Sequence, residues 1–214
     1  MIRVKICGVT TLEDARFALE CGADALGLNF VPGTPRCLRE DAAASLAAAL
    51  PPFGVRVGVF VNEDPRRIEQ IARQVGLDAV QLHGDETPED CRQLGERGLR
   101  VIRGLRVRGP ETLDEAERFP GCAILLDAWV EGRLGGTGRT FDWSLARRLA
   151  ERRTVILSGG LKPENVAQAI QEVRPYGVDA SSGVEGHAPG RKDPERVRRF
   201  IENARGVLAA MGGE

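Results

Sequence analysis

The sequence predicts an α/β fold, a (β/α)8 TIM barrel in which eight parallel strands are each followed by a helix. Short apolar runs rich in β-branched residues recur about every 20–30 residues along the chain, eight times in all. A segment with helical spacing of apolar residues follows each run. No linker or change of composition divides the chain, so we expect a single barrel domain over residues 1–214. An open doubly wound sheet is the alternative, but it usually has fewer strands and a clear switch point.

The eight apolar runs have the composition of strands that are covered on both faces. Near-continuous Val, Ile and Leu is what a parallel sheet between layers of helices requires. The expected strands are residues 2–7, 23–30, 55–61, 77–83, 99–105, 122–127, 154–158 and 177–181.

Helix signals fill the segments between these strands. Positions such as Ile68, Ile71 and Val75 repeat at helical spacing and leave Arg and Glu on the outer face. Several segments carry a proline suited to the first turn of a helix, namely Pro88, Pro110, Pro163 and Pro194. The expected helices are residues 11–22, 39–50, 64–76, 87–98, 110–119, 141–153, 162–173 and 193–208.

The overall composition argues against several classes of protein. The formal net charge is −1, so no global field favours nucleic acid or an anionic membrane. No apolar run approaches the ~20 residues that a membrane span needs, and the N-terminus lacks the pattern of a signal peptide. We therefore expect a cytoplasmic protein with no nucleic-acid or membrane partner, either a monomer or a homodimer.

Cysteine and histidine spacing argues against a metal site. The chain contains no Cys-x-x-Cys pair and only two histidines, at positions 83 and 187. The five cysteines are an odd and widely spaced set, which predicts reduced thiols. They lie at positions 7, 21, 37, 91 and 122.

Two loops carry the signals of a phosphate site. Active sites of this fold lie in the loops after the strands, and the loops after the seventh and eighth strands often bind phosphate. Here these loops read "LSGGLKPENV" and "DASSGVEGHAPG". Small residues let the backbone approach an anion closely, although they could also simply make tight turns. The expected phosphate-binding residues are Gly159, Gly160, Ser181, Ser182 and Gly183.

Reactive side chains end two other strands. Cys7 ends the first strand, where it could either fill space or do chemistry. Asp127 follows the apolar run "AILL" into the barrel mouth, where a carboxyl group suits general acid work or could cap the next turn. The glycine-rich segment that follows, residues 129–143, is long for such a loop and suggests a mobile cover over a site.

Two further side chains near strand ends allow two interpretations each. Arg36 lies in the loop after the second strand. Its guanidinium group could make a bidentate contact with a substrate carboxylate, or it could pair with a neighbouring helix. His83 ends the fourth strand and could contact a ligand or bond to a backbone carbonyl in the core. Arg103 and Arg106 flank the expected end of the fifth strand.

The motifs taken together resemble one known family. These motifs occur in order over nearly the whole chain: "KICGVT", "VGVFVN", "VQLHGDE", "LLDAW" with "GGTGRTFDW", "LSGGLKPENV", and "VDASSGVE" followed by "PGRKD". They resemble the phosphoribosylanthranilate isomerases, the enzymes of the Amadori rearrangement in tryptophan biosynthesis. The resemblance implies a phosphorylated small-molecule substrate, N-(5-phosphoribosyl)anthranilate, and no cofactor, since the substrate's own nitrogen serves as the electron sink.

The resemblance also implies roles for particular residues. Cys7 corresponds to the general base, Asp127 to the general acid, and Arg36 to the residue that contacts the anthranilate carboxylate. His83 and Asp179 are expected to bind substrate. A thiol must ionise to act as a base, and the sequence leaves open whether Lys5 or a loop dipole promotes this. The rival interpretations are a related isomerase of histidine biosynthesis, which uses two aspartates, and a non-catalytic barrel that binds a phosphometabolite.

Overall fold

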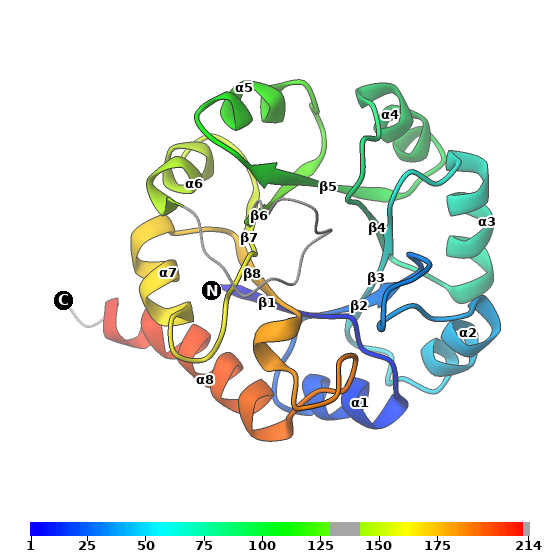
Figure 1. Ribbon diagram of the computed structural model, residues 1–214, viewed down its shortest axis with the longest axis horizontal. Helices are drawn as coiled ribbons and strands as arrows, with labels where there is room; N and C mark the ends of the chain where they lie inside the picture. The colour runs from blue at the N-terminus through cyan, green and yellow to red at the C-terminus, as the bar shows by residue number, and fades with distance from the viewer. Residues whose placement is uncertain (129–141, 212–214) are drawn as a thin grey trace.

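The computed structural model describes residues 1–128 and 142–211, and in these residues strands and helices alternate along the chain (Figure 1). The strands are β1 (Arg3–Cys7), β2 (Ala25–Asn29), β3 (Val55–Phe60), β4 (Ala79–Leu82), β5 (Arg100–Val107), β6 (Ala123–Ala128), β7 (Val155–Leu157) and β8 (Gly177–Ala180). The helices are α1 (Leu12–Glu20), α2 (Glu40–Ala48), α3 (Pro65–Val75), α4 (Pro88–Glu96), α5 (Glu111–Glu117), α6 (Trp143–Ala150), α7 (Val166–Val173) and α8 (Pro194–Met211). The glycine-rich segment expected to cover the site lies, apart from its last two residues, outside the described residues.

The eight strands close into one barrel in chain order, and β8 pairs with β1. Every pair is parallel, and the helices surround the ring of strands (Figure 1). The predicted (β/α)8 barrel is therefore confirmed.

Successive side chains of each strand point alternately toward the helices and into the barrel, and this produces two separate apolar clusters. Val4 and Ile6 of β1 belong to the large cluster between strands and helices. A smaller cluster fills the barrel interior near the start of the strands, and it consists of Val57, Ala79, Ile102, Leu125 and Ile156. Successive inward residues are two apart. Two positions further along, the inward residues are the polar Gln81 on β4, Asp127 on β6 and Ser158 after β7, whereas β3 places Val59 there. The barrel interior is therefore apolar near the N-terminal ends of the strands. Near the C-terminal ends of the strands it contains polar side chains that are available for chemistry.

Helix starts follow local capping chemistry. Pro88 and Pro194 occupy the first position of α4 and α8, as predicted. Pro110 instead directly precedes α5. The expected start at Pro163 is wrong, since α7 begins at Val166. The side chain of Asn165 accepts a hydrogen bond from the Lys162 amide at 2.8 Å and holds residues 163–165 in a turn.

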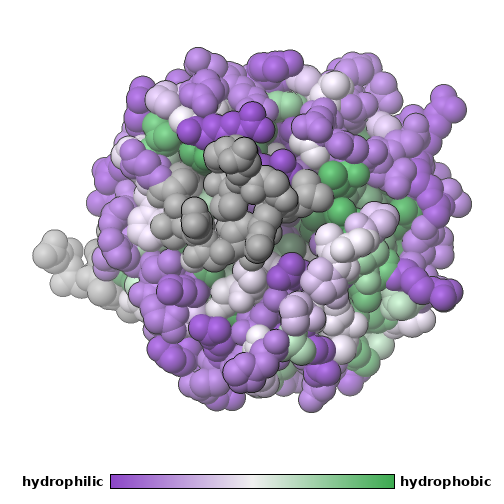
Figure 2. All heavy atoms as spheres, viewed as in Figure 1, coloured by the Kyte–Doolittle hydropathy of each residue, from purple (hydrophilic) through white to green (hydrophobic). Residues whose placement is uncertain are grey.

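Polar side chains cover the outside of the helix ring. Arg and Glu residues occupy the outer helix faces, and Figure 2 shows hydrophilic residues over most of the visible surface. Among the helices of residues 1–128 and 142–211, none combines the length and apolarity needed to cross a bilayer.

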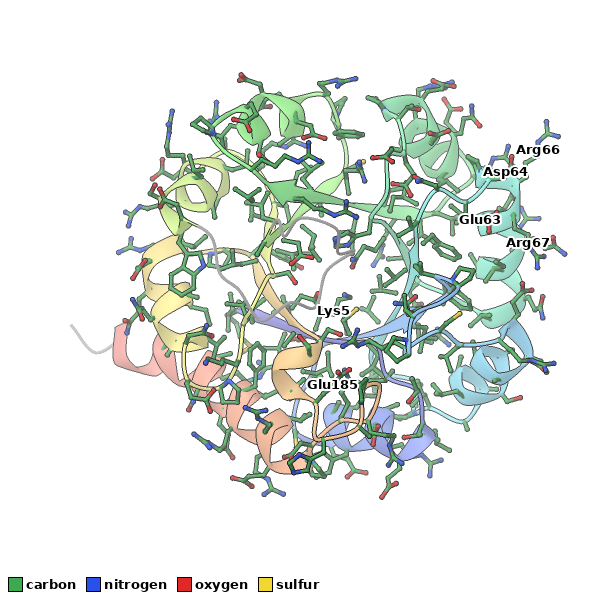
Figure 3. The ribbon with its side chains drawn as sticks, viewed as in Figure 1. Lys5, Glu63, Asp64, Arg66, Arg67 and Glu185 are labelled. Atoms are coloured by element: carbon green, nitrogen blue, oxygen red, sulfur yellow. The ribbon has the colours of Figure 1, made fainter. Side chains whose placement is uncertain are left out.

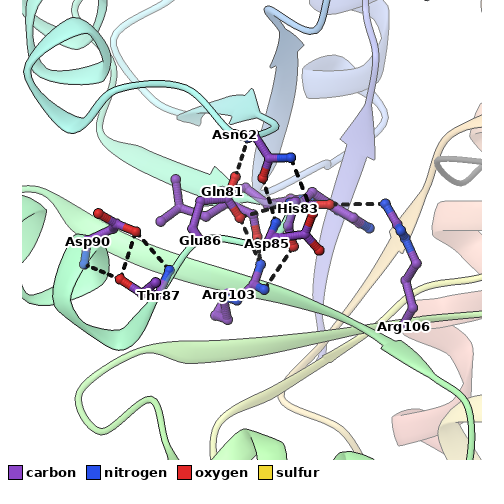
Figure 4. A network of polar contacts seen from close by, with 11 residues as sticks. Asn62, Gln81, His83, Asp85, Glu86, Thr87, Asp90, Arg103 and Arg106 are labelled. Carbon is purple, nitrogen blue, oxygen red and sulfur yellow. Dashed lines mark hydrogen bonds and ion pairs between the residues drawn. The ribbon is translucent and has the colours of Figure 1, made fainter.

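Contrary to the sequence prediction, Arg103 does not flank the end of β5. Because β5 continues to Val107, Arg103 is mid-strand and faces the helix layer. Its Nη1 lies 3.0 Å from Oε2 of Glu86, and the guanidinium stands 5.0 Å from the centre of the Phe119 ring. Figure 4 shows this buried pair. Arg103 therefore joins the β4–α4 loop to the barrel wall.

Arg103→Met is expected to lower the free energy of unfolding by about 3–5 kcal/mol, because it leaves the buried Glu86 carboxylate without its partner. Urea denaturation measures the change. Arg92→Met is the matched control, since its pairs with Glu89 and Glu96 are exposed. An Arg103→Met midpoint as little changed as that of the control would contradict this role.

Candidate active site

A cavity of about 500 Å³ opens at the C-terminal ends of the strands. It is lined by every residue that the sequence singles out for a site: Cys7, Arg36, His83, Asp127, Gly159, Gly160, Asp179, Ser181, Ser182 and Gly183. The chain segments that carry them are far apart in sequence, and barrel closure brings them to one rim.

A larger cavity, about 1300 Å³, opens at the opposite end of the barrel. Its lining comes from the first residues of the strands, such as Ala25, Ala79 and Ala123, and includes neither Cys7 nor Asp127. The smaller cavity is the candidate site, because it holds the reactive thiol and carboxyl groups.

Within the described part of the chain, no three His, Cys, Asp or Glu side chains form a group that could hold a metal ion.

Cys7 stands at the end of β1 and is buried in the cavity wall. Its register partner on β2 is Gly27, where a Cβ atom would lie 2.6 Å from the Cys7 sulfur. Gly27 therefore leaves the space that the thiol fills. Burial raises the pKa of the Cys7 thiol, and the positive charges of Lys5 and Lys192 oppose this effect without cancelling it. The thiol is thus mostly neutral at neutral pH in the unliganded protein.

Asp127 lies near the end of β6 with both carboxylate oxygens close to N–H groups or ring nitrogens. Oδ1 accepts a hydrogen bond from the Ala128 amide at 2.9 Å. Oδ2 lies 3.3 Å from Nε2 of His83. The carboxylate therefore accepts from the next backbone amide and also lines the cavity.

Arg36 makes a forked ion pair with Glu185, in the loop after β8. Its Nε and Nη2 each lie 2.7 Å from a carboxylate oxygen of Glu185. Arg36 thus pairs with a loop rather than with a neighbouring helix. In the described residues its Nη1 makes no hydrogen bond, and the side chain lines the cavity.

Glu185 and Lys192 lie behind Arg36, outside the cavity lining, and were not predicted as site residues. Lys192 Nζ lies 3.1 Å from Glu185 Oε1, and the pair supports Arg36 from the outside. Burial raises the pKa of Glu185, but Arg36 and Lys192 outweigh burial and hold it below its usual value. Glu185 closes the motif "SSGVE", and Lys192 lies in the segment "PGRKD" that follows it. Both residues therefore stand in segments that carry the family resemblance, although the sequence predicts no role for either.

The two glycine loops line the cavity, and several of their backbone amides have no partner among the described residues. Gly159 and Gly160 adopt φ of 82° and 66°, which other residues rarely adopt. At Gly183 a Cβ atom would lie 1.9 Å from the Leu161 carbonyl oxygen, so the two loops touch through backbone alone. Among hydrogen bonds of the described residues, none is donated by the amides of Gly159, Gly160, Ser182 or Gly183. Such amides are suited to bind an anion.

Below the loops, Asp179 is held inside the barrel by Lys5 and Ser158. Lys5 Nζ donates to Asp179 Oδ1 at 2.8 Å, and Ser158 Oγ donates to Oδ2 at 3.2 Å. Figure 3 shows Lys5 inside the ring of strands. Burial lowers the pKa of Lys5, but Asp179 and Cys7 together outweigh burial and raise this pKa to about 12. Lys5 therefore stays an ammonium ion throughout the ordinary pH range.

A comparison with protein families agrees with this geometry. A family model described as N-(5'phosphoribosyl)anthranilate (PRA) isomerase matches residues 4–203. The chain belongs to this family.

Relatives in the PRA isomerase family align with the chain almost from end to end. The N-(5'-phosphoribosyl)anthranilate isomerase of Rubrobacter xylanophilus is 51% identical over 96% of this chain and 100% of its own length. The crystal structure of the Thermotoga maritima phosphoribosyl anthranilate isomerase is 48% identical, with a TM-score of 0.91 over 96% of this chain and 100% of that chain. A second crystal structure of a PRA isomerase is in complex with reduced 1-(o-carboxyphenylamino)-1-deoxyribulose 5-phosphate. It is 47% identical, with a TM-score of 0.87 and the same coverage.

Proposed function

We propose that the protein converts N-(5-phosphoribosyl)anthranilate to 1-(2-carboxyphenylamino)-1-deoxyribulose 5-phosphate, an aldose–ketose isomerisation in tryptophan biosynthesis. The observation that carries this proposal is a single cavity lined by a thiol, a carboxyl group, an arginine side chain and two glycine loops. The complex of a family member with a reduced carboxyphenylamino-deoxyribulose phosphate supports the same substrate class.

In the first proposed step, Asp127 donates a proton to the ring oxygen of the ribose. The bond between this oxygen and C1 breaks while the nitrogen lone pair forms a C1=N bond, which gives a cationic Schiff base. This iminium group withdraws electrons from C2 and makes the C2 hydrogen acidic.

In the second proposed step, Cys7 removes the C2 proton as a thiolate. The electron pair forms a C1–C2 double bond and returns the nitrogen to neutrality, and the resulting enolamine tautomerises to the ketone. Burial raises the pKa of the Cys7 thiol, so ionisation in the complex needs positive charge nearby. The iminium adds such a charge to those of Lys5 and Lys192.

The remaining groups bind the two ends of the substrate. The amides of the glycine loops are suited to the phosphate. Arg36, whose Nη1 makes no hydrogen bond to any described residue, is suited to the anthranilate carboxylate. These contacts hold the sugar between Cys7 and Asp127.

Arg36→Ala is expected to raise KM about tenfold to a hundredfold with a smaller effect on kcat, because it removes charged hydrogen bonds present before and during the reaction. Steady-state kinetics with phosphoribosylanthranilate measure both constants. Arg39→Ala is the matched control, since Arg39 pairs with Asp41 in an exposed position. An unchanged KM in Arg36→Ala would exclude the carboxylate contact.

The proposal as a whole is tested by following the fluorescence of phosphoribosylanthranilate with purified protein. Loss of fluorescence with formation of the carboxyphenylamino product is expected. Turnover of the corresponding substrate of histidine biosynthesis instead would favour the first rival. Ligand binding without any turnover would favour the non-catalytic barrel.

We also propose that residues 1–214 act as a single domain in the cytoplasm, as a monomer or homodimer. The five cysteines are free thiols, which is typical of a reducing compartment.

A further inference from the structure

We propose that Lys5 and Gln81 fix the tautomer of His83, so that the ring presents an Nε2–H group to Asp127. Gln81 is then a positioning residue for the general acid. The catalytic consequence rests on the proposed function, whereas the tautomer itself does not depend on it.

The three side chains form a buried row across the barrel interior. Gln81 and His83 are two residues apart and face inward from the end of β4. Lys5 Nζ lies 3.0 Å from Oε1 of Gln81, and Nε2 of Gln81 lies 2.8 Å from Nδ1 of His83. Figure 4 shows the contact between Gln81 and His83. All three residues are buried, so water does not replace these contacts.

The charge of Lys5 determines how the amide of Gln81 is oriented. An ammonium group has donors only, so the atom of Gln81 that faces it must be the carbonyl oxygen. Lys5 keeps its charge because Asp179 is its ion-pair partner at 2.8 Å. The NH2 group of Gln81 consequently points to His83.

The orientation of Gln81 in turn determines which ring nitrogen of His83 carries the proton. Nδ1 accepts from the Gln81 NH2 group and must therefore offer its lone pair. In a neutral imidazole the proton then resides on Nε2. Gly104 on the next strand leaves room for the ring, since a Cβ atom there would lie 2.8 Å from Nδ1.

The Nε2–H group is poised beside Asp127 without a partner of its own. Nε2 is buried and makes no hydrogen bond within the described residues, although Oδ2 of Asp127 is only 3.3 Å away. A nitrogen that already carries a proton does not take one from Asp127. The acid's proton is therefore left for the substrate, and the carboxylate that remains gains a donor.

NMR on protein labelled with 15N-histidine tests the tautomer without any turnover. The chain has only two histidines, and the His187→Ala spectrum assigns them. His83 is expected to show the Nε2–H pattern in the unaltered protein. An Nδ1–H pattern would overturn the proposal.

Gln81→Glu tests the cause, because a carboxylate offers no donor to Nδ1. We expect the Nε2–H pattern of His83 to be lost and kcat to fall about tenfold to a hundredfold, with KM changed less. Gln70→Glu, on the exposed face of α3, is the matched control and should leave both readouts unchanged.

Gln81→Met is the second variant, for use if Gln81→Glu does not fold. It removes the amide without adding charge, and a mixture of His83 tautomers is expected. A pure Nε2–H pattern in a folded Gln81 variant would show that Gln81 does not set the tautomer and would overturn the proposal.

Discussion

Cys7→Ala lowers kcat by about two to four orders of magnitude if Cys7 is the general base, because no other group then takes the C2 proton. The affinity for a product analogue should change far less, since alanine removes one atom from the cavity wall. Stopped-flow or steady-state fluorescence measures kcat, and calorimetry measures the affinity. Cys21→Ala is the matched control, because Cys21 lies at the end of α1 outside the cavity.

The pH profile makes the test of Cys7 specific. The reaction uses the thiolate, and burial raises the pKa of the Cys7 thiol. The fraction of thiolate therefore grows as the pH rises, and kcat/KM should increase toward alkaline pH in the unaltered enzyme. This rise of kcat/KM toward alkaline pH should be absent from the residual activity of Cys7→Ala. Near-normal turnover in that variant would remove Cys7 from the mechanism.

Asp127→Asn is expected to have the second large effect, a fall in kcat of about two to four orders of magnitude. Asparagine keeps the shape of the side chain and an oxygen for the Ala128 amide, but it has no acidic proton to donate. Ring opening then proceeds without an acid. The same kinetic and binding assays separate this loss from a loss of affinity.

Asp64→Asn is the matched control for Asp127→Asn. Asp64 caps α3 through the amides of Arg66 and Arg67, and asparagine caps equally well. The control should therefore keep full activity and stability. If Asp127→Asn kept comparable activity, proton donation would have to come from another group, and Asp127 would act only through its backbone contact.

Much of this architecture is predictable from sequence because the signals are local. All eight expected strands overlap the observed ones, since runs of Val, Ile and Leu between helix caps are a strong local pattern. The site residues reach one cavity because parallel strands in a barrel end at the same rim. Cys7 and Asp127 could be nominated for that reason before any geometry was known.

The contacts between these residues could not be predicted, because they depend on register across the closed barrel. The partners Lys5 and Gln81 are 76 residues apart, and Arg36 and Glu185 are 149 apart. No local sequence pattern indicates that the members of either pair are in contact. The predicted position of Arg103 at a strand end was wrong for a related reason. The sequence does not show that β5 continues to Val107, and Arg103 therefore lies in the middle of the strand.

The pair of Lys5 and Asp179 also bears on how the chain closes on itself. These residues face each other where the first strand meets the last, 174 positions apart in sequence. If β1 slipped by one residue, Ile6 would replace Lys5 in the interior and the ammonium group would enter the apolar layer beneath the helices. An unpaired buried charge costs about 3–5 kcal/mol, so the slipped barrel is strongly disfavoured. The charge beneath the active site thus selects the alignment in which the ring of strands is completed.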